Sequence, residues 1–177
     1  MDLSQNSLTG VADVLTSPSI NFVNFSYNEL TSIGYMVKSR LAYKSIQTFD
    51  VGHNNIQHSA SEFLNRLPPS LKGAMIHDNS FSGTLPDPLP SLSLMEVFDA
   101  SQNDLIGTLP DFSRSMPRVA KIGLSYQKLR GTGGLVGPIP QEIASLLDLL
   151  ELDLSGNYLT GSIPSSIGNI PRLKGTN

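Results

Sequence analysis

The chain has 177 residues, with 12 Lys and Arg against 15 Asp and Glu, and a formal net charge of −3. This near balance gives no electrostatic argument for binding nucleic acid or an anionic membrane surface. The absence of cysteine excludes disulfides, thiolate chemistry and cysteine-ligated zinc. The sequence opens on neither the basic region nor the apolar core of a signal peptide, and no apolar stretch is long enough to cross a bilayer. We therefore expect a segment that does not itself insert into a membrane.

One eleven-residue phrase recurs along the chain, at intervals of 22 to 30 residues. In chain order its copies read MDLSQNSL (1–8, entered at the fourth position), INFVNFSYNEL (20–30), IQTFDVGHNNI (46–56), LKGAMIHDNSF (71–81), MEVFDASQNDL (95–105), VAKIGLSYQKL (119–129) and LLELDLSGNYL (149–159). The first, fourth, sixth and eleventh positions are apolar in every copy, and the ninth is Asn or Gln. The phrase is similar to the L-x-x-L-x-L-x-x-N-x-L signature of leucine-rich repeats.

Each copy of the phrase predicts one turn of a coil with a short strand at its centre. Alternate apolar side chains of that strand point into the coil, and the side chains between them point out. One repeat cannot bury its own apolar face, so neighbouring repeats must stack with their strands in parallel. We predict an α/β leucine-rich-repeat solenoid of about seven repeats, curved around a parallel concave sheet. It forms a single domain, 1–177, with repeats near 1–19, 20–45, 46–70, 71–94, 95–118, 119–148 and 149–172.

The ninth position of the phrase predicts a structural ladder of amides. It is occupied by Asn6, Asn28, Asn54, Asn79, Asn103, Gln127 and Asn157. A side-chain amide has two donor hydrogens and an acceptor oxygen, which can satisfy backbone groups where the chain turns off the sheet. Gln127 is one methylene longer than Asn, so we expect a distorted rung there.

The second half of several repeats carries a further motif. Residues 81–86 read FSGTLP, 105–110 read LIGTLP, 137–140 read GPIP and 159–164 read LTGSIP. This LxGxIP pattern resembles the plant-type repeat of receptor-like kinase ectodomains, receptor-like proteins and polygalacturonase-inhibiting proteins. The resemblance covers nearly the whole chain and is most specific from Leu71 to Leu173. It implies a second small strand at GxIP and 3₁₀ or short helices on the convex side, with core closed by Leu109, Phe112, Met116 and Val119, or Ile163, Ile167, Ile170 and Leu173.

Three stretches depart from the family pattern. Repeats two and three lack GxIP and carry helix-like sequences at Tyr35–Tyr43 and Ser61–Leu67, the latter ended by two prolines. Repeat six has extra residues between Leu129 and Gly137, which we expect to bulge as a flexible loop. Both ends of the chain fall within repeats, although solenoids need polar caps. We therefore expect a fragment of a longer array or an incomplete gene, with self-association through uncapped ends as an alternative.

Side chains on the outward positions of the strands form columns across the predicted concave face, with rungs about 4.8 Å apart. The least repetitive of them are the expected partner-binding residues: Phe22, Tyr27, Asp50, His53, Met75, His77, Asp78, Val97, Asp99, Lys121 and Tyr126. Exposed aromatic, His and Met side chains are typical of recognition surfaces. Single exposed apolar residues are also ordinary on any protein surface, so the alternative is that these residues have no specific role.

Catalysis and metal binding are weakly supported by the sequence. His53, His77, Asp50, Asp78 and Asp99 fall on neighbouring rungs, but their spacing follows the repeat and no ligand motif. No nucleophile elbow accompanies a His–Asp pair. We therefore predict no catalytic residue, no metal and no cofactor. Asn24-Phe25-Ser26 is the single N-glycosylation sequon, with Asn24 as a candidate acceptor on the concave face.

The resemblance implies a non-catalytic module that binds a protein or peptide on its concave face. We expect the extracellular, ligand-recognising part of a receptor-like protein or kinase that signals from the cell surface. The alternative is a secreted, wall-associated or inhibitor-like protein that binds an enzyme or a glycan. An ice-binding solenoid is less favoured, because the outward columns are irregular and contain Asp, Tyr and His.

Overall fold

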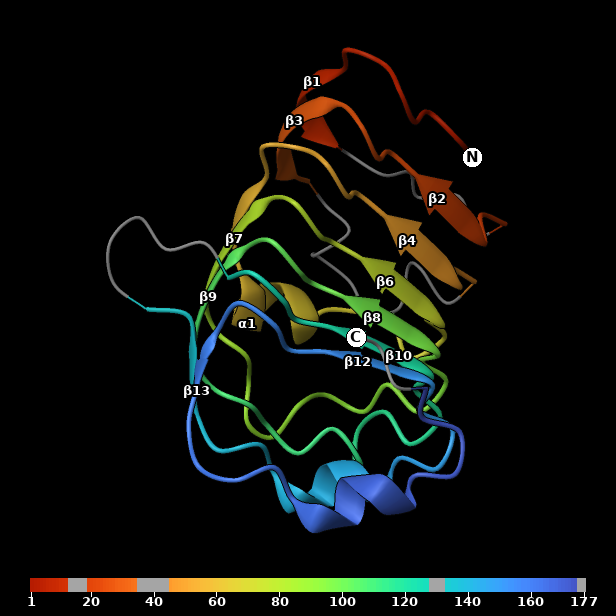
Figure 1. The fold of residues 1–177 in the computed structure, drawn as a ribbon. Helices are drawn as coiled ribbons and strands as arrows, with labels where there is room; N and C mark the ends of the chain where they lie inside the picture. Colours follow the sequence, from red (N-terminus) through yellow and green to blue (C-terminus); the bar gives the residue numbers. More distant parts are fainter. Residues whose placement is uncertain (13–18, 35–44, 128–132, 175–177) are drawn as a thin grey trace.

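The computed structural model describes residues 1–12, 19–34, 45–127 and 133–174, and these residues wind into a right-handed coil of parallel strands (Figure 1). The wall on one side is a six-stranded parallel sheet in the order β12-β10-β8-β6-β4-β2. Its strands are β2 (Phe22–Asn24), β4 (Thr48–Asp50), β6 (Gly73–Met75), β8 (Val97–Asp99), β10 (Lys121–Gly123) and β12 (Glu151–Asp153). A bridge from Asp2 to Asn24 extends the same wall toward the N-terminus.

The register of this sheet places equivalent positions of the repeated phrase side by side. Val23, Phe49, Ala74, Phe98, Ile122 and Leu152 pair in one row across the six strands. The first five of these fourth-position side chains are fully buried in the coil. A shift by one residue in any strand would turn its apolar side chains outward, so burial fixes the register. The columns expected from the sequence are therefore real neighbours in space.

A second wall forms where the GxIP motif was expected to make strands. It contains β5 (Gln57–Ser59), β7 (Ser80–Thr84), β9 (Asp104–Thr108), β11 (Leu135–Gly137) and β13 (Tyr158–Leu159). Toward the N-terminus, β1 (Thr9–Ala12) pairs with β3 (Glu29–Ile33) in a separate two-stranded sheet. Glycines in the motif adopt the left-handed conformation, as at Gly83, Gly107, Gly137 and Gly161. A side chain there would be strained, which explains the glycine of the motif.

Short helices close the coil opposite the first sheet. α1 (Ala60–Leu64) begins at Ser59, whose hydroxyl accepts a hydrogen bond from the Glu62 N–H at 3.3 Å. It confirms the helix expected at Ser61–Leu67, but it starts earlier and is shorter. η2 (Gln141–Ser145) and η3 (Ser165–Asn169) are 3₁₀ helices, drawn as the blue turns at the bottom of Figure 1. The helix expected at Tyr35–Tyr43 lies outside the described residues.

The core runs continuously between the two walls and the convex segments. Leu109, Phe112, Met116 and Val119 are all buried, as the resemblance implied. The prediction that Ile163 closes the core of the last repeat is wrong. Ile163 is 75% exposed, because no described residue packs over it, whereas Ile170 is buried. The core thus forms as expected where a further turn of the coil is stacked on it.

The insertion in repeat six is placed differently from the sequence expectation. Leu135–Val136–Gly137 forms strand β11, and Leu135 is fully buried. The Leu135 N–H donates to the Asn157 side-chain oxygen at 3.2 Å, just as the Leu105 N–H donates to the Gln127 side-chain oxygen at 3.1 Å. Leu135 therefore fills the eleventh position, and the extra residues precede it. Residues 128–132, including Leu129, lie outside the described part.

Candidate functional site

The Asn ladder marks the inner boundary of the concave face. In the rung of Asn54, the amide nitrogen donates to the carbonyl oxygens of Val51 at 3.0 Å and, one rung away, of Phe25 at 3.0 Å. The Asn54 side-chain oxygen accepts the Leu30 N–H at 3.0 Å. The same arrangement recurs at Asn28, Asn79, Asn103, Gln127 and Asn157. Each amide therefore joins its own turn to the preceding one.

The rung at Gln127 is regular, and the distortion expected there is wrong. Its amide nitrogen donates to the carbonyl oxygens of Leu124 and Ala100, both at 3.1 Å, and its oxygen accepts from Leu105. These bonds reproduce those of Asn103 in the preceding rung. The extra methylene is thus absorbed within the buried side chain.

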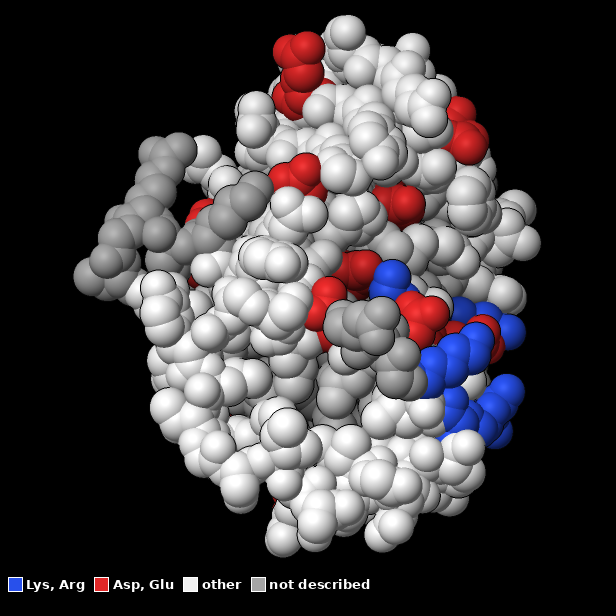
Figure 2. Space-filling view, in the orientation of Figure 1, with Lys and Arg blue, Asp and Glu red and all other residues white. Residues whose placement is uncertain are grey.

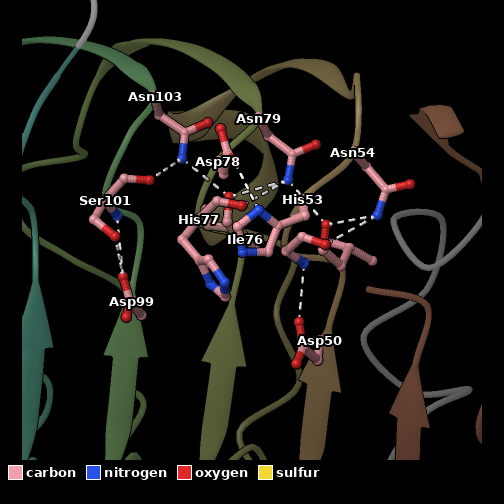
Figure 3. Close-up of polar contacts among 12 residues, drawn as sticks. Asp50, His53, Asn54, Ile76, His77, Asp78, Asn79, Asp99, Ser101 and Asn103 are labelled. Carbon is pink, nitrogen blue, oxygen red and sulfur yellow. Dashed lines mark hydrogen bonds and ion pairs between the residues drawn. The ribbon is translucent and has the colours of Figure 1, made fainter. Parts of the chain in front are cut away.

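The fifth position of the phrase also has a structural task. The Asp50 carboxylate accepts the Gly52 N–H at 2.9 Å, and the Asp99 carboxylate accepts the Ser101 N–H at 3.1 Å and its hydroxyl at 2.6 Å. Figure 3 shows these bonds in the rungs of Asp50 and Asp99. Asn24 forms the equivalent bonds to Ser26. One oxygen of each expected binding carboxylate is therefore occupied by its own chain. The glycosylation of Asn24 stays a prediction.

The eighth position turns each side chain outward through a left-handed backbone. Its occupants are Gln5, Tyr27, His53, Asp78, Gln102, Tyr126 and Gly156, and all have φ between 50° and 64°. Non-glycine residues adopt this conformation at a cost of about 1–2 kcal/mol. Only Gly156 occupies it without a side chain. The sequence did not reveal this shared strain, because the six non-glycine residues are of four different types.

Four side chains from three neighbouring rungs meet in the middle of the concave face. The Tyr27 ring stacks on the His53 ring with centroids 4.1 Å apart, and the His53 ring meets the His77 ring edge-on at 5.0 Å. His53 Nδ1 lies 2.6 Å from the Asp78 carboxylate. We call Tyr27, His53, His77 and Asp78 the imidazole cluster; Figure 3 shows its last three members. It presents a partly exposed polar and aromatic surface.

Glycines in one rung leave space for side chains of a neighbouring rung. A Cβ added to Gly52 would lie 2.6 Å from His77 Nε2, and one added to Gly123 would lie 2.6 Å from an Asp99 carboxylate oxygen. At the eighth position, a Cβ on Gly156 would lie 2.5 Å from the Tyr126 ring. These glycines hold His77, Asp99 and Tyr126 against the sheet. His77 Nδ1 is buried there without a hydrogen-bond partner in the described part of the chain.

An ion pair joins the fifth and sixth rungs of the face. Lys121 Nζ lies 3.2 Å from the Asp99 carboxylate. Burial raises the pKa of Asp99, but the Ser101 hydroxyl and N–H, followed by the charges of Lys121 and His77, lower it more and leave it below its ordinary value. Asp99 is therefore ionised at neutral pH. Among the described residues, no group of three or more His, Asp or Glu side chains is arranged to hold a metal ion.

Residues 148–170 match the Leucine Rich Repeat family. Receptor-like protein 18 of Arabidopsis thaliana is 27% identical over 187 residues, covering 93% of this chain and 22% of that protein. Receptor-like protein 43 of the same plant is 29% identical over 188 residues, covering 98% of this chain and 26% of that protein. The chain is thus similar to plant-type leucine-rich-repeat proteins. It spans about a quarter of the length of these curated relatives.

Solved leucine-rich-repeat structures support the same fold. The ectodomain of the Arabidopsis receptor kinase HAESA, in complex with an N-terminally extended IDA peptide hormone, has a TM-score of 0.79 and 25% identity. It covers 97% of this chain and 28% of that one. A TDR receptor has a TM-score of 0.77 and 26% identity, covering 94% of this chain and 28% of that one. In the described ranges of our leucine-rich-repeat chain, no helix is both long and apolar enough to cross a membrane.

The concave face of this leucine-rich-repeat coil brings together some of the expected binding residues and separates others. Phe22, Tyr27 and Tyr126 are well exposed, and His53, Met75, His77, Asp78, Val97 and Lys121 are half-buried along the same face. Asp50 and Asp99 are partly engaged by their own turns. Sequence reasoning missed the glycines at 52, 123 and 156 that seat the neighbouring side chains. Their signal was a glycine in an outward column beside a larger residue in a neighbouring rung.

Proposed function

We propose that this chain is the extracellular, ligand-recognising part of a receptor-like protein or kinase, and that it binds an extended peptide without catalysing a reaction. The peptide lies along the concave sheet, across the rungs that carry the imidazole cluster. The observation that supports this most is the stacked Tyr27–His53 pair beside His77 and Asp78, on a continuous sheet face. The HAESA ectodomain, similar over 97% of this chain, was solved with a peptide hormone.

The physical reason is that this face combines rigidity with exposed contact area. Tyr27 is 52% exposed and stacks on His53. Tyr126 is 59% exposed and packs over Gly156. Aromatic side chains held in one position bury much surface on binding and lose little conformational entropy. Such anchors commonly dominate the binding energy of an interface.

Selection from a library of displayed peptides, followed by affinity measurement, tests this proposal. Gln5 and Gln102 occupy the same eighth position with a left-handed backbone. Tyr27→Gln and Tyr126→Gln therefore introduce a side chain that this backbone accepts. We expect each variant to weaken a selected peptide by about tenfold or more, as expected for loss of an aromatic anchor. Melting temperatures should change by less than about 3 °C, which is under roughly 1 kcal/mol.

The matched control is Tyr158→Gln. Tyr158 is 65% exposed on strand β13 of the second wall, away from the concave sheet. The control should bind the selected peptides as the unaltered chain does. Peptides that bind Tyr27→Gln and Tyr126→Gln with undiminished affinity would overturn the proposal.

A further inference from the structure

The outward positions of the concave sheet carry a net negative charge. The third, fifth, seventh and eighth positions of the phrase contain six carboxylates, Asp2, Asp50, Asp78, Asp99, Glu151 and Asp153, against a single amino group, Lys121. Their net charge is −5. The second position adds only Lys72 and Glu96, which lie 3.5 Å apart as an ion pair. Carboxylates thus outnumber amino groups at the outward positions of the described strands.

The carboxylates are spread along the sheet and do not form one cluster. They come from five of the rungs, and neighbouring rungs are about 4.8 Å apart. In Figure 2 the red Asp and Glu atoms are spread over several separate patches, and the blue Lys and Arg atoms gather at the lower right. Burial raises the pKa of Asp153, but hydrogen bonds from Ser155 and Ser125 lower it more, so this group is ionised at neutral pH, as Asp99 is. An extended ligand therefore meets negative charge at several points along its length.

We propose that the occupant of the concave face is a basic peptide segment, whose Lys or Arg side chains alternate with small residues. This inference rests on the proposed function and names the chemistry of its ligand. An extended chain places alternate side chains about 6.6 Å apart on one side, which lies between one and two rung spacings. Guanidinium groups also stack favourably on exposed aromatic rings, which Tyr27 and Tyr126 supply on the same face.

The repeat itself offers charge-deleting variants that keep the fold. Asn24 stands at the fifth position and accepts the Ser26 N–H at 3.0 Å and hydroxyl at 2.7 Å, as aspartate does in other rungs. Asp50→Asn and Asp153→Asn should therefore keep the bonds to Gly52 and Ser155 while removing two negative charges. The control, Glu62→Gln with Glu142→Gln, removes the same charge from exposed positions on α1 and η2.

The experiment measures fluorescence anisotropy of three labelled octapeptides, alternating Arg-Ser, Gly-Ser and Glu-Ser, at low and physiological salt. We expect the Arg-Ser peptide to bind about tenfold or more tightly than Gly-Ser, and salt to weaken it. Asp50→Asn with Asp153→Asn should weaken it about five- to tenfold, since two exposed charge contacts are lost. The Glu62→Gln, Glu142→Gln control should change it less than twofold.

Equal affinity for the three peptides, or equal losses in the concave and control variants, would overturn the basic-ligand inference. The proposed function has a separate readout. If library peptides lose affinity with Tyr27→Gln but carry no excess of Lys or Arg, the concave binding site stands and the charge inference fails. If the Arg-Ser peptide binds but is indifferent to both Tyr27→Gln and the concave charge variants, both proposals fail.

Discussion

The eighth and ninth positions of the phrase are chain neighbours in every repeat, yet their surroundings are opposite. The ninth is an amide in all seven copies, and from Asn28 onward it bonds the backbone of two turns, as Asn54 does. The eighth differs from rung to rung, points outward and has a left-handed backbone throughout. The coil therefore constrains the side chain at the ninth position and only the backbone at the eighth. Chemistry specific to this chain can therefore vary at the eighth position without loss of fold.

The largest effect is expected from breaking the ladder. Asn103 is fully buried, and its amide serves the Phe81 N–H and the carbonyl oxygens of Ile76 and Ala100. Asn103→Ala leaves these groups unpaired in the core, so we expect about 3 kcal/mol or more of lost stability. Urea denaturation measures it. Asn103→Gln should cost clearly less, because Gln127 makes the same bonds one rung later; equal losses would contradict this explanation.

This difference also explains what the sequence could predict. The apolar period and the amide column specify the strands, their parallel register and the ladder, because every rung repeats the same requirement. The sequence prediction was wrong at the insertion of repeat six. Leu129 lies two residues after Gln127, so it was assigned the eleventh position. The better signal was the match of Leu135-Val136-Gly137 to Leu105-Ile106-Gly107, whose strands pair in the structure.

The contents of the concave face were predicted only as a list of residues. The pairing of His53 with Asp78, and the seat of His77 above Gly52, depend on how side chains lean from one rung to the next. No pattern within one repeat contains that information. The left-handed eighth column was also missed, because Gly is the usual signal for this conformation and only Gly156 supplies it.

The second-largest effect tests the seat of His77. Gly52→Ala would force the His77 ring to move, and overpacking of this kind costs about 1–3 kcal/mol. We expect a loss near the lower end, since a side chain and not the backbone must yield. In a His77→Ala background the same substitution should cost much less. A thermal-denaturation double-mutant cycle measures the coupling, and purely additive losses would count against direct contact.

A smaller effect is expected from the backbone of the eighth position. Gln102 has φ of 53°, so Gln102→Gly should relieve strain of about 1–2 kcal/mol. Glycine also gains more entropy on unfolding, which offsets about 0.5–1 kcal/mol of that relief. We expect a net stabilisation below about 1 kcal/mol in urea denaturation. Gln102→Val should instead destabilise, since branched side chains suit this conformation least; the opposite order would contradict the assigned strain.

The smallest effect concerns how the stability of the fold at acid pH depends on Asp99, at the fifth position of the phrase. The pKa of folded Asp99 lies below its ordinary value of 3.8, because the opposing effect of burial is exceeded by its bonds to Ser101 and by Lys121. Its carboxylate therefore stabilises the fold above the unfolded pKa, and this contribution is lost as the pH falls through the lower folded pKa. Asp99→Asn keeps the acceptor for Ser101 but does not titrate. The melting temperature of the variant should accordingly fall less steeply than that of the unaltered chain between about pH 5 and pH 2, the range around an ordinary aspartate pKa. Parallel curves for the two proteins would mean that Ser101 and Lys121 do not favour the ionised form of Asp99, which would contradict the assigned cause of its lowered pKa.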